Sequence, residues 1–221
     1  MISVAIDGPA GAGKSTVARA AAKELGYIYV DTGALYRAVG LYMLQHGISV
    51  SDEDAVVKEL SKLQVSLEFR GGEQHVLLCG EDVSAQIRTP EVSMAASAVS
   101  AMQPVRSFLF DLQKNMAKTN NVIMDGRDIG TVVLPEAQVK IFLTASDEER
   151  AGRRYRELLE KGQNASFEEV LNDLRARDYA DSHRAAAPLK PAEDSVLVDT
   201  TGLSLENSVQ KVLQVVRQKL G

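Results

Sequence analysis

Short apolar runs alternate with amphipathic segments along most of the chain. Ile2–Ile6 is a short apolar run that ends at Asp7-Gly8, which predicts a buried strand. Residues 14–25 carry apolar side chains at helical spacing and stop at Gly26, a residue type that commonly ends helices. Tyr27–Val30 then predicts a second strand. A strand, a loop, a helix and a strand in this order predict parallel strands joined by a right-handed crossover.

The pattern changes in the middle of the chain. Residues 34–46 predict a helix, and Ser51, which precedes three acidic residues, predicts the N-cap of the next one. Residues about 64–88 contain short β-type runs separated by Gly71-Gly72 and Gly80, which predicts an antiparallel meander. Because predicted helices flank the meander, we interpret it as part of a small inserted subdomain.

The second half of the chain returns to alternating elements. The pattern predicts strands at 122–124, 139–143 and 195–198, and helices at about 90–102, 104–118, 146–161, 166–180 and 204–220. Alternating strands and helices favour an α/β fold with a parallel sheet and helices on both faces. The predicted fold class is therefore an α/β protein with an inserted subdomain that carries a small antiparallel sheet.

Composition and charge narrow the function. The 221 residues are 45% hydrophobic, which suffices for an ordinary buried core, and the net charge is −5. A net negative charge argues against nucleic acid as a partner, so any anion site has to be built locally. Cys79 is the one cysteine, which excludes an internal disulfide and fits a reducing compartment. The sequence shows no secretion signal and no apolar run of membrane-spanning length, so we expect a cytoplasmic protein with no membrane partner.

The predicted first turn carries a phosphate-binding motif. Gly8-Pro9-Ala10-Gly11-Ala12-Gly13-Lys14-Ser15 matches G-x-x-x-x-G-K-[ST] at every fixed position, between a predicted strand and a predicted helix, and Thr16 follows it. Glycines let backbone N–H groups approach phosphate oxygens, and the helix N-terminus points its positive end at the same place. Lys14 adds a full charge for the β- and γ-phosphates, and the Ser15 hydroxyl can ligate Mg²⁺. The segment predicts a P-loop for a nucleoside triphosphate.

Other nucleotide-binding classes fit less well. The chain contains no G-x-G-x-x-G dinucleotide motif and no Asn-Lys-x-Asp base-reading motif, which argues against a dinucleotide fold and a GTPase. Asp199-Thr200-Thr201-Gly202 resembles a GTPase switch sequence but lies near the far end of the chain. We interpret it as a turn between a strand and a loop.

Two arginines are placed where an acceptor phosphate would bind. Arg37 follows the second predicted strand, and Arg127 follows the strand at 122–124. Ligands of parallel sheets bind at the carboxyl ends of the strands, and a guanidinium binds phosphate through parallel N–H bonds. Taken singly, each arginine is more often a surface ion-pair partner; beside a P-loop, the pair favours a phosphate clamp. Asp125 ends an apolar strand, as a Mg²⁺-binding carboxylate does, with a turn aspartate as the alternative.

The segment 150–184 is rich in arginine. Acidic neighbours such as Glu149, Glu157 and Glu160 indicate solvated ion pairs for some of these arginines. Others precede a turn at Gly162 between two helices, which is typical of a lid that closes over a transferring phosphoryl group. The arginines of this segment are Arg150, Arg153, Arg154, Arg156, Arg175, Arg177 and Arg184. We expect a minority of these seven to be functional.

These motifs together resemble those of the bacterial cytidylate kinase family, in its long form. The resemblance covers essentially the whole chain, and related P-loop kinases share the first motif but not the set. It rests on residues 6–16 around the P-loop, Asp-Thr-Gly-Ala-Leu-Tyr-Arg at 31–37, Ile-Arg-Thr-Pro-Glu-Val at 87–92, Asp-Gly-Arg-Asp-Ile-Gly-Thr-Val-Val at 125–133 and Arg-Ala-Ala-Ala-Pro-Leu at 184–189.

The resemblance implies three parts and one reaction. Residues 1–31 and 119–221 would form a P-loop core with a helical lid at about 150–165. Residues 32–118 would form a subdomain that binds a nucleoside monophosphate, with the meander at about 64–88. The reaction would transfer the γ-phosphoryl group of ATP, with Mg²⁺, to CMP or dCMP.

The resemblance also implies roles for single residues. The acceptor site would be lined by Thr32, Tyr36, Arg37, Ser97, Arg106, Arg127, Asp128, Asp181 and Arg184, with Ser97 and Arg106 reading cytosine, Arg127 and Arg184 holding its phosphate, and Asp181 contacting the sugar. Catalysis would rest on Lys14, Arg127, Arg153, Arg177 and Arg184, ATP binding on Gly8–Thr16 and Arg154, and Mg²⁺ binding on Ser15 and Asp125. The alternatives for Ser97 and Arg106 are a small residue on a packed helix and a surface charge.

Two alternative functions stay open on the sequence alone. The chain could be a P-loop kinase for another small acceptor, such as another nucleotide or an alcohol. It could instead be a nucleotide-binding regulatory protein without turnover, although such a protein needs no acceptor clamp. No exposed apolar stripe stands out, so we expect a monomer.

Overall fold

The core of the protein is a five-stranded parallel sheet in the order β2-β6-β1-β7-β8. The structure, a computed structural model, describes residues 1–160 and 162–221. The sheet places the strand before the P-loop at its centre, between β6 and β7. The strands are β1 (Ser3–Asp7), β2 (Ile28–Asp31), β6 (Val122–Gly126), β7 (Val139–Thr144) and β8 (Val196–Asp199).

Helices cover both faces of this sheet. Alternate residues of β1 point to opposite faces: Val4 and Ile6 belong to a cluster with α1 (Lys14–Leu25) and α8 (Leu205–Leu220). Ala5 belongs to a cluster on the other face, with α5 (Gln103–Thr119) and the π-helical turn η2 (Ile129–Val133). The predicted fold class is therefore confirmed, and all five strands are buried at least in part.

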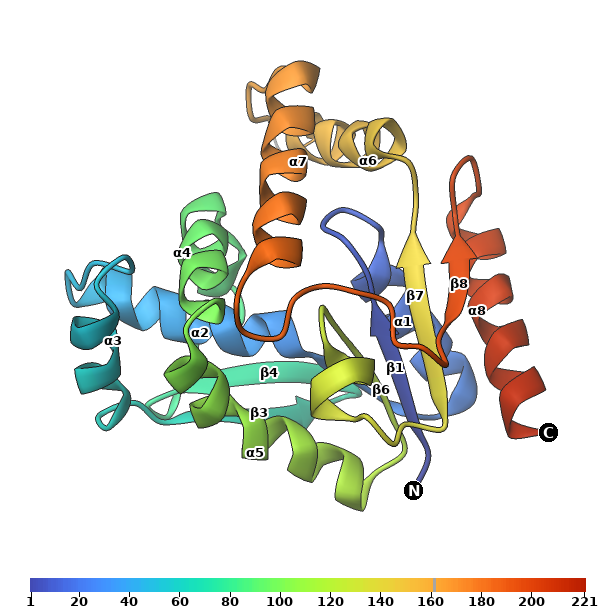
Figure 1. Cartoon of the computed structure of the whole chain (residues 1–221), viewed down its shortest axis with the longest axis horizontal. Helices are drawn as coiled ribbons and strands as arrows, with labels where there is room; N and C mark the ends of the chain where they lie inside the picture. Colours follow the sequence, from blue (N-terminus) through green and yellow to red (C-terminus); the bar gives the residue numbers. More distant parts are fainter. Residues whose placement is uncertain (161) are drawn as a thin grey trace.

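The segment between β2 and β6 builds a hydrophobic core of its own. Its buried residues run from Ala34 to Leu109. Figure 1 shows its helices and small sheet extending away from the parallel sheet, with α3 farthest from β8. Its elements are α2 (Thr32–Gln45), α3 (Glu53–Leu60), the antiparallel strands β3 (Val65–Arg70), β4 (Glu73–Leu78) and β5 (Glu81–Asp82), the 3₁₀ helix η1 (Gln86–Arg88), α4 (Pro90–Ser100) and the first part of α5.

Two charged helices stand over the carboxyl ends of the strands. They are α6 (Asp147–Glu160) and α7 (Phe167–His183), and β7 and β8 point toward them in Figure 1. A small cluster joins them to the P-loop, because Ala10 packs against Ala151, Val170 and Leu174. The P-loop is thus covered from above by side chains that lie more than 140 residues later in the chain.

Most predicted element ends lie within a few residues of the observed ones. Ser51 was the wrong N-cap: α3 is capped by Asp52, whose side chain accepts from Ala55 N at 3.0 Å. Both are good N-cap types, and the residue adjoining the first helical turn takes the role. Position 161, the predicted end of one helix, lies outside the described residues. Among those described, no helix is both long and apolar enough to cross a membrane.

Candidate active site

One cavity of about 540 Å³ opens at the carboxyl ends of the strands, between the P-loop, α4 and α7. Nearly all predicted site residues line it, from segments that are far apart in the sequence. The lining comprises Ala10 to Thr16, Asp31, Thr32, Gly33, Tyr36, Arg37, Arg88, Ser93, Ala96, Ser97, Ser100, Arg106, Asp125 to Asp128, Arg153, Arg154, Glu157, Leu174, Arg177, Asp181 and Arg184.

Gly8 and Pro9 are the predicted site residues that do not line the cavity. Gly8 has φ of 152°, and a Cβ there would lie 2.0 Å from the carbonyl oxygen of Leu143 on β7. The glycine is thus required by close packing against the next strand. Gly11 and Gly13, with φ of 70° and 84°, supply the left-handed turns of the loop.

Lys14 lies inside the P-loop and is nearly inaccessible to solvent. Its Nζ donates to the carbonyl oxygen of Pro9 at 2.7 Å. Burial, followed by the nearby Arg127 guanidinium, lowers the pKa of Lys14 to about 7. An anionic phosphate placed beside Nζ would reverse this effect, because an opposite charge favours the protonated amine.

The two predicted Mg²⁺ ligands lie side by side. The Ser15 hydroxyl donates to Asp125 Oδ2 at 2.8 Å, and the Tyr29 hydroxyl donates to Asp125 Oδ1 at 2.9 Å. Burial, together with the charge of Asp31, raises the pKa of Asp125 to about 6. A hydroxyl and a carboxylate are the hard oxygen ligands that Mg²⁺ prefers, and a carboxylate that is destabilised by burial gains from a cation beside it. The residues present therefore fit Mg²⁺.

A second charge network lies across the cavity. Asp128 is buried and accepts from Arg106 Nη2, and its other oxygen accepts from Arg184 Nη2 at 3.4 Å. Arg127 Nε donates to Asp181 Oδ2 at 2.7 Å. The interpretation of Arg106 as a surface charge is wrong, since the side chain is 7% exposed and lies over the Tyr36 ring. Each of these guanidiniums keeps N–H groups that its carboxylate does not use.

Arg37 is held at the edge of the cavity by Asp31. Its Nη2 lies 2.7 Å from Asp31 Oδ2, and Arg88 Nη1 lies 3.2 Å from the same oxygen. Burial opposes the charge of Asp31, but the two guanidiniums outweigh it and lower its pKa. Sequence reasoning missed Arg88, although the residue belongs to the Ile-Arg-Thr-Pro-Glu-Val motif at 87–92.

The lid arginines differ in what they contact. Arg153 Nη2 donates to the carbonyl oxygen of Thr200 at 2.9 Å, and Nη1 reaches Ala12 O at 3.5 Å. Arg154 pairs with Glu157 at 2.8 Å. Arg177 is partly buried, and its buried Nε has no hydrogen-bond partner among the described residues. Burial, and then the charge of Arg127, lowers the pKa of Arg177 to about 10.

Arg150 supports the P-loop from the lid side. Its Nη1 donates to Ala10 O at 2.6 Å and to Asp178 Oδ2 at 2.5 Å, while Asp178 Oδ1 accepts from Ala10 N at 2.9 Å. The pair therefore binds both backbone polar groups of one P-loop residue. Sequence reasoning did not find this role for Arg150 or Asp178, because no local pattern indicates it.

Asp7 supports the acceptor side in a similar way. Its two carboxylate oxygens accept from Ile129 N at 2.8 Å and from Gly130 N at 2.7 Å. These N–H groups directly follow Arg127 and Asp128, so Asp7 ties the strand before the P-loop to the segment that carries both. Burial raises the pKa of Asp7 to about 6, against the two N–H groups, which lower it.

The lining of the cavity is strongly cationic. It contains nine lysine and arginine side chains and five carboxylates, an excess of four positive charges, in a chain whose net charge is −5. Such an arrangement favours a ligand or ligand pair that carries several negative charges. Among the described residues, no group of three or more His, Cys, Asp or Glu side chains could hold a metal ion.

Comparisons with known proteins agree with the geometry. The structure is similar to an uncharacterised protein from Eubacterium ventriosum, with a TM-score of 0.56 at 11% identity over 98% of this chain and 99% of the other. It is also similar to a gluconokinase from Sinorhizobium meliloti, with a TM-score of 0.51 at 15% identity over 98% and 92%. At these identities the two structures support the fold alone.

Sequence relatives go further. The chain is 51% identical to a cytidylate kinase of Carboxydothermus hydrogenoformans, over 98% of this chain and 97% of the relative. It is 50% identical to a cytidylate kinase of Streptococcus pyogenes, over 95% and 93%. The family model described as cytidylate kinase matches residues 4–218. The chain therefore belongs to the cytidylate kinase family.

Proposed function

We propose that this protein transfers the γ-phosphoryl group of ATP to CMP or dCMP, giving ADP and CDP or dCDP. The observation that carries the proposal is the single cavity in which the P-loop faces Arg37, Arg127 and Arg184. A P-loop alone would suit any nucleoside triphosphatase. A second set of guanidiniums across the same cavity suits an acceptor that carries a phosphate of its own.

The donor side binds the triphosphate. The backbone N–H groups of Gly11 to Thr16 surround the phosphates, and Lys14 exchanges its contact with Pro9 O for the β- and γ-oxygens. Arg153 and Arg154 approach from α6, on the lid side of the same loop. Ser15 and Asp125 would hold Mg²⁺, which would neutralise charge on the phosphate oxygens.

The acceptor side binds the nucleoside monophosphate. Arg37, Arg127 and Arg184 hold its phosphate, and Asp181 accepts from a sugar hydroxyl. The cytosine contacts Ser97, Arg106 and Asp128. Thr32 and Tyr36 lie beside these residues. A cytosine presents ring acceptors and an amino donor, so guanidinium and carboxylate groups together match its edge. A base that leaves such buried groups unpaired is disfavoured.

The chemistry needs no covalent intermediate and no strong general base. An oxygen of the acceptor phosphate is already anionic, so it attacks the γ-phosphorus directly, and the bond to the β–γ bridging oxygen breaks as ADP leaves. Catalysis comes from in-line positioning and from positive charge around the transferring group. Lys14, Arg127, Arg153, Arg177 and Arg184 provide that charge.

The same residues suggest how the parts move. We take residues 1–31 and 119–221 as the core, with the lid at about 150–165, and residues 32–118 as the acceptor-binding subdomain. Arg37 and Arg106 belong to the subdomain and Arg153 to the lid, so closure of both brings the charges together and excludes water. We expect the protein to act as a monomer in the cytoplasm.

A coupled assay of ADP release tests the proposal. Purified protein with ATP and Mg²⁺ is given CMP, dCMP, UMP, AMP or a sugar alcohol at equal concentrations. We expect CMP or dCMP to give the highest kcat/KM. Faster turnover of AMP or an alcohol would contradict the cytidylate assignment, and ADP release at background level with every acceptor would favour a regulatory nucleotide-binding protein.

A further inference from the structure

Asp31 is shared by two arginines that have different surroundings. Its carboxylate is 6% exposed, and both contacts are made to Oδ2. Arg37 is largely buried and lines the cavity, whereas the Arg88 side chain is half-exposed at the rim. One buried carboxylate therefore carries two guanidiniums, of which only Arg37 has been given a role.

Asp31 joins the parallel sheet to the inserted segment. Asp31 ends β2 and caps α2, where Oδ1 accepts from Ala34 N at 3.0 Å. Arg37 lies in the second turn of α2. Arg88 ends η1, directly before Thr89, which caps α4. Asp31 thus belongs to the parallel sheet, and both of its arginines belong to the inserted segment.

Arg37 cannot give its full fork to a phosphate while Asp31 holds it. The Arg37 Nη2 is occupied by Asp31, and the buried Nε has no hydrogen-bond partner among the described residues. Turning Arg37 toward a phosphate would leave the buried Asp31 carboxylate without a counter-ion if it had no other partner. An unpaired buried charge is strongly disfavoured, so Asp31 would then compete with the phosphate for Arg37.

We propose that Arg88 is a positioning residue, which keeps Asp31 neutralised so that Arg37 is free to bind the acceptor phosphate. The inference rests on the proposed function, because it assigns the phosphate to Arg37. Arg88 acts through Asp31 and Arg37. Loss of Arg88 leaves Asp31 and Arg37 as an exclusive pair, and acceptor binding then has to break that pair.

Kinetics of Arg88→Gln test this role. We expect KM for the acceptor to rise about tenfold, the size of one lost charge-assisted hydrogen bond, with kcat reduced less than threefold. Arg88→Lys keeps the charge and should restore most of the affinity. Arg70→Gln is the matched control, since Arg70 is also half-exposed and ion-paired, to Glu68 and Asp82 on the small sheet. An unchanged KM in Arg88→Gln would overturn the proposal.

A double-mutant cycle with Asp31→Asn separates positioning from direct contact. Asparagine is as good an N-cap as aspartate, so this variant keeps the start of α2 and removes only the charge. If Arg88 acts through Asp31, Arg88→Gln should raise KM less than threefold in the Asp31→Asn background. An equal, tenfold rise in both backgrounds would show that Arg88 acts on the ligand itself, and would overturn the proposal.

Two features keep this result separate from the proposed function. The cycle uses whichever acceptor the wild-type protein turns over best, so a different acceptor would revise the function but not the cycle. NMR of the Arg37 side chain in the protein without ligand gives a readout independent of turnover. Rotation of its guanidinium should slow in Arg88→Gln, because Asp31 holds Arg37 alone, and faster or unchanged rotation would contradict the inference.

Discussion

Replacing Arg150 by methionine tests the link between the lid helices and the P-loop. The substitution keeps most of the side-chain volume but removes the donors to Ala10 O, Ala145 O, Asp147 and Asp178. Arg150 is 4% exposed, whereas Asp178 is 19% exposed and keeps its bond from Ala10 N. Breaking a buried pair costs about 3–5 kcal/mol. Partial exposure of Asp178 places the expected loss near the lower end, about 3 kcal/mol.

Urea unfolding and thermal melting measure this loss. For a chain of this length, about 3 kcal/mol corresponds to a melting temperature lower by about 7 °C. Asp178→Asn should also destabilise, and the Arg150→Met/Asp178→Asn double variant should lose less than the sum of the two, because the second change removes a charge that the first left unpaired. KM for ATP should rise in the same variants, since Ala10 is part of the loop that holds the triphosphate.

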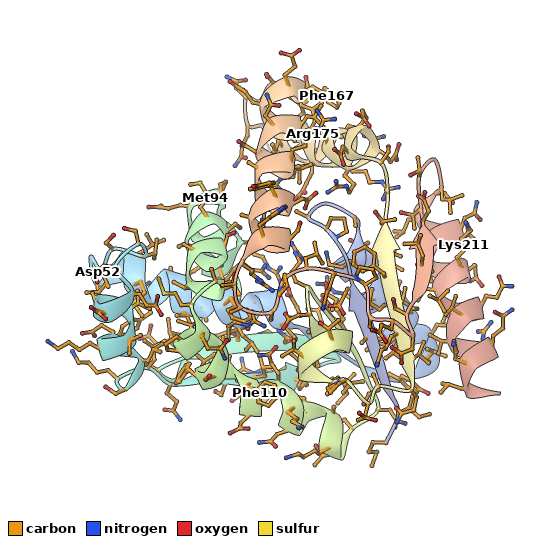
Figure 2. The ribbon with its side chains drawn as sticks, viewed as in Figure 1. Asp52, Met94, Phe110, Phe167, Arg175 and Lys211 are labelled. Atoms are coloured by element: carbon orange, nitrogen blue, oxygen red, sulfur yellow. The ribbon has the colours of Figure 1, made fainter. Side chains whose placement is uncertain are left out.

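Arg175→Met is the matched control. Arg175 joins the same two helices, through ion pairs with Asp147 and Glu148, but its side chain is half-exposed; Figure 2 labels it on α7, beside α6. Exposed pairs contribute roughly 0–1 kcal/mol. A loss below about 1 kcal/mol for Arg150→Met, or equal losses for Arg150→Met and Arg175→Met, would refute the reasoning.

Four further outcomes are expected. Lys14→Ala should lower kcat by orders of magnitude in the coupled assay, without lowering the melting temperature at pH 6, because burial lowers the pKa of Lys14 to about 7 and so disfavours its charged form. Asp7, whose pKa is raised to about 6, binds a proton more tightly in the folded than in the unfolded state, so wild-type stability should fall as pH rises from 4 to 6. In urea titrations, Asp7→Asn should reduce this fall in the free energy of unfolding by on the order of 3 kcal/mol. An unchanged dependence of the free energy of unfolding on pH would contradict this prediction. Arg177→Met should leave the melting temperature of the free protein within about 2 °C of the wild-type value. The rise in melting temperature that ATP and CMP produce together should be smaller than in the wild type. EDTA should abolish ADP release, and added Mg²⁺ should restore it; full activity in EDTA would contradict the role of Ser15 and Asp125.

Local patterns allowed prediction of the parts of the site that local sequence builds. The strand, the Gly-rich loop and the helix of the P-loop occupy consecutive residues. One motif was therefore enough to predict where Lys14 and Ser15 lie in the fold. Arg37 and Arg127 could be placed near it, because both follow strands of a parallel sheet and the carboxyl ends of such strands lie at one edge. In the structure both line the same cavity as the P-loop.

The supporting contacts could not be predicted in this way. Arg150 binds a carbonyl oxygen 140 residues earlier in the chain, and Asp7 binds N–H groups more than 120 residues later. Their partners are backbone groups, which carry no signature in the sequence. Arg150 belongs to an arginine-rich segment that also contains the exposed Arg156 and Arg175. Only the packing of α6 over the P-loop distinguishes these side chains from one another.

The carboxylates of the cavity offset the positive charge of its arginines. Asp31, Asp128 and Asp181 each neutralise one or two guanidiniums, and each is itself buried. These carboxylates offset the desolvation of the arginines and fix their positions before a phosphate arrives. Under the proposed function, a bound phosphate would compete with these carboxylates for the guanidiniums, and we expect this competition to limit its affinity.

Arg177 differs from these arginines, because no ion pair joins it to a carboxylate among the described residues, and the charge of Arg127 adds to the effect of burial in lowering its pKa. Its charge is therefore stabilised mainly when negative charge enters the cavity. An enzyme that must hold a phosphoryl group most tightly during its transfer gains from one such cation, since a group without a resident counter-ion gives its full interaction to the charge that arrives. We therefore expect the paired arginines to order the site and Arg177 to stabilise the charge of the transferring phosphoryl group.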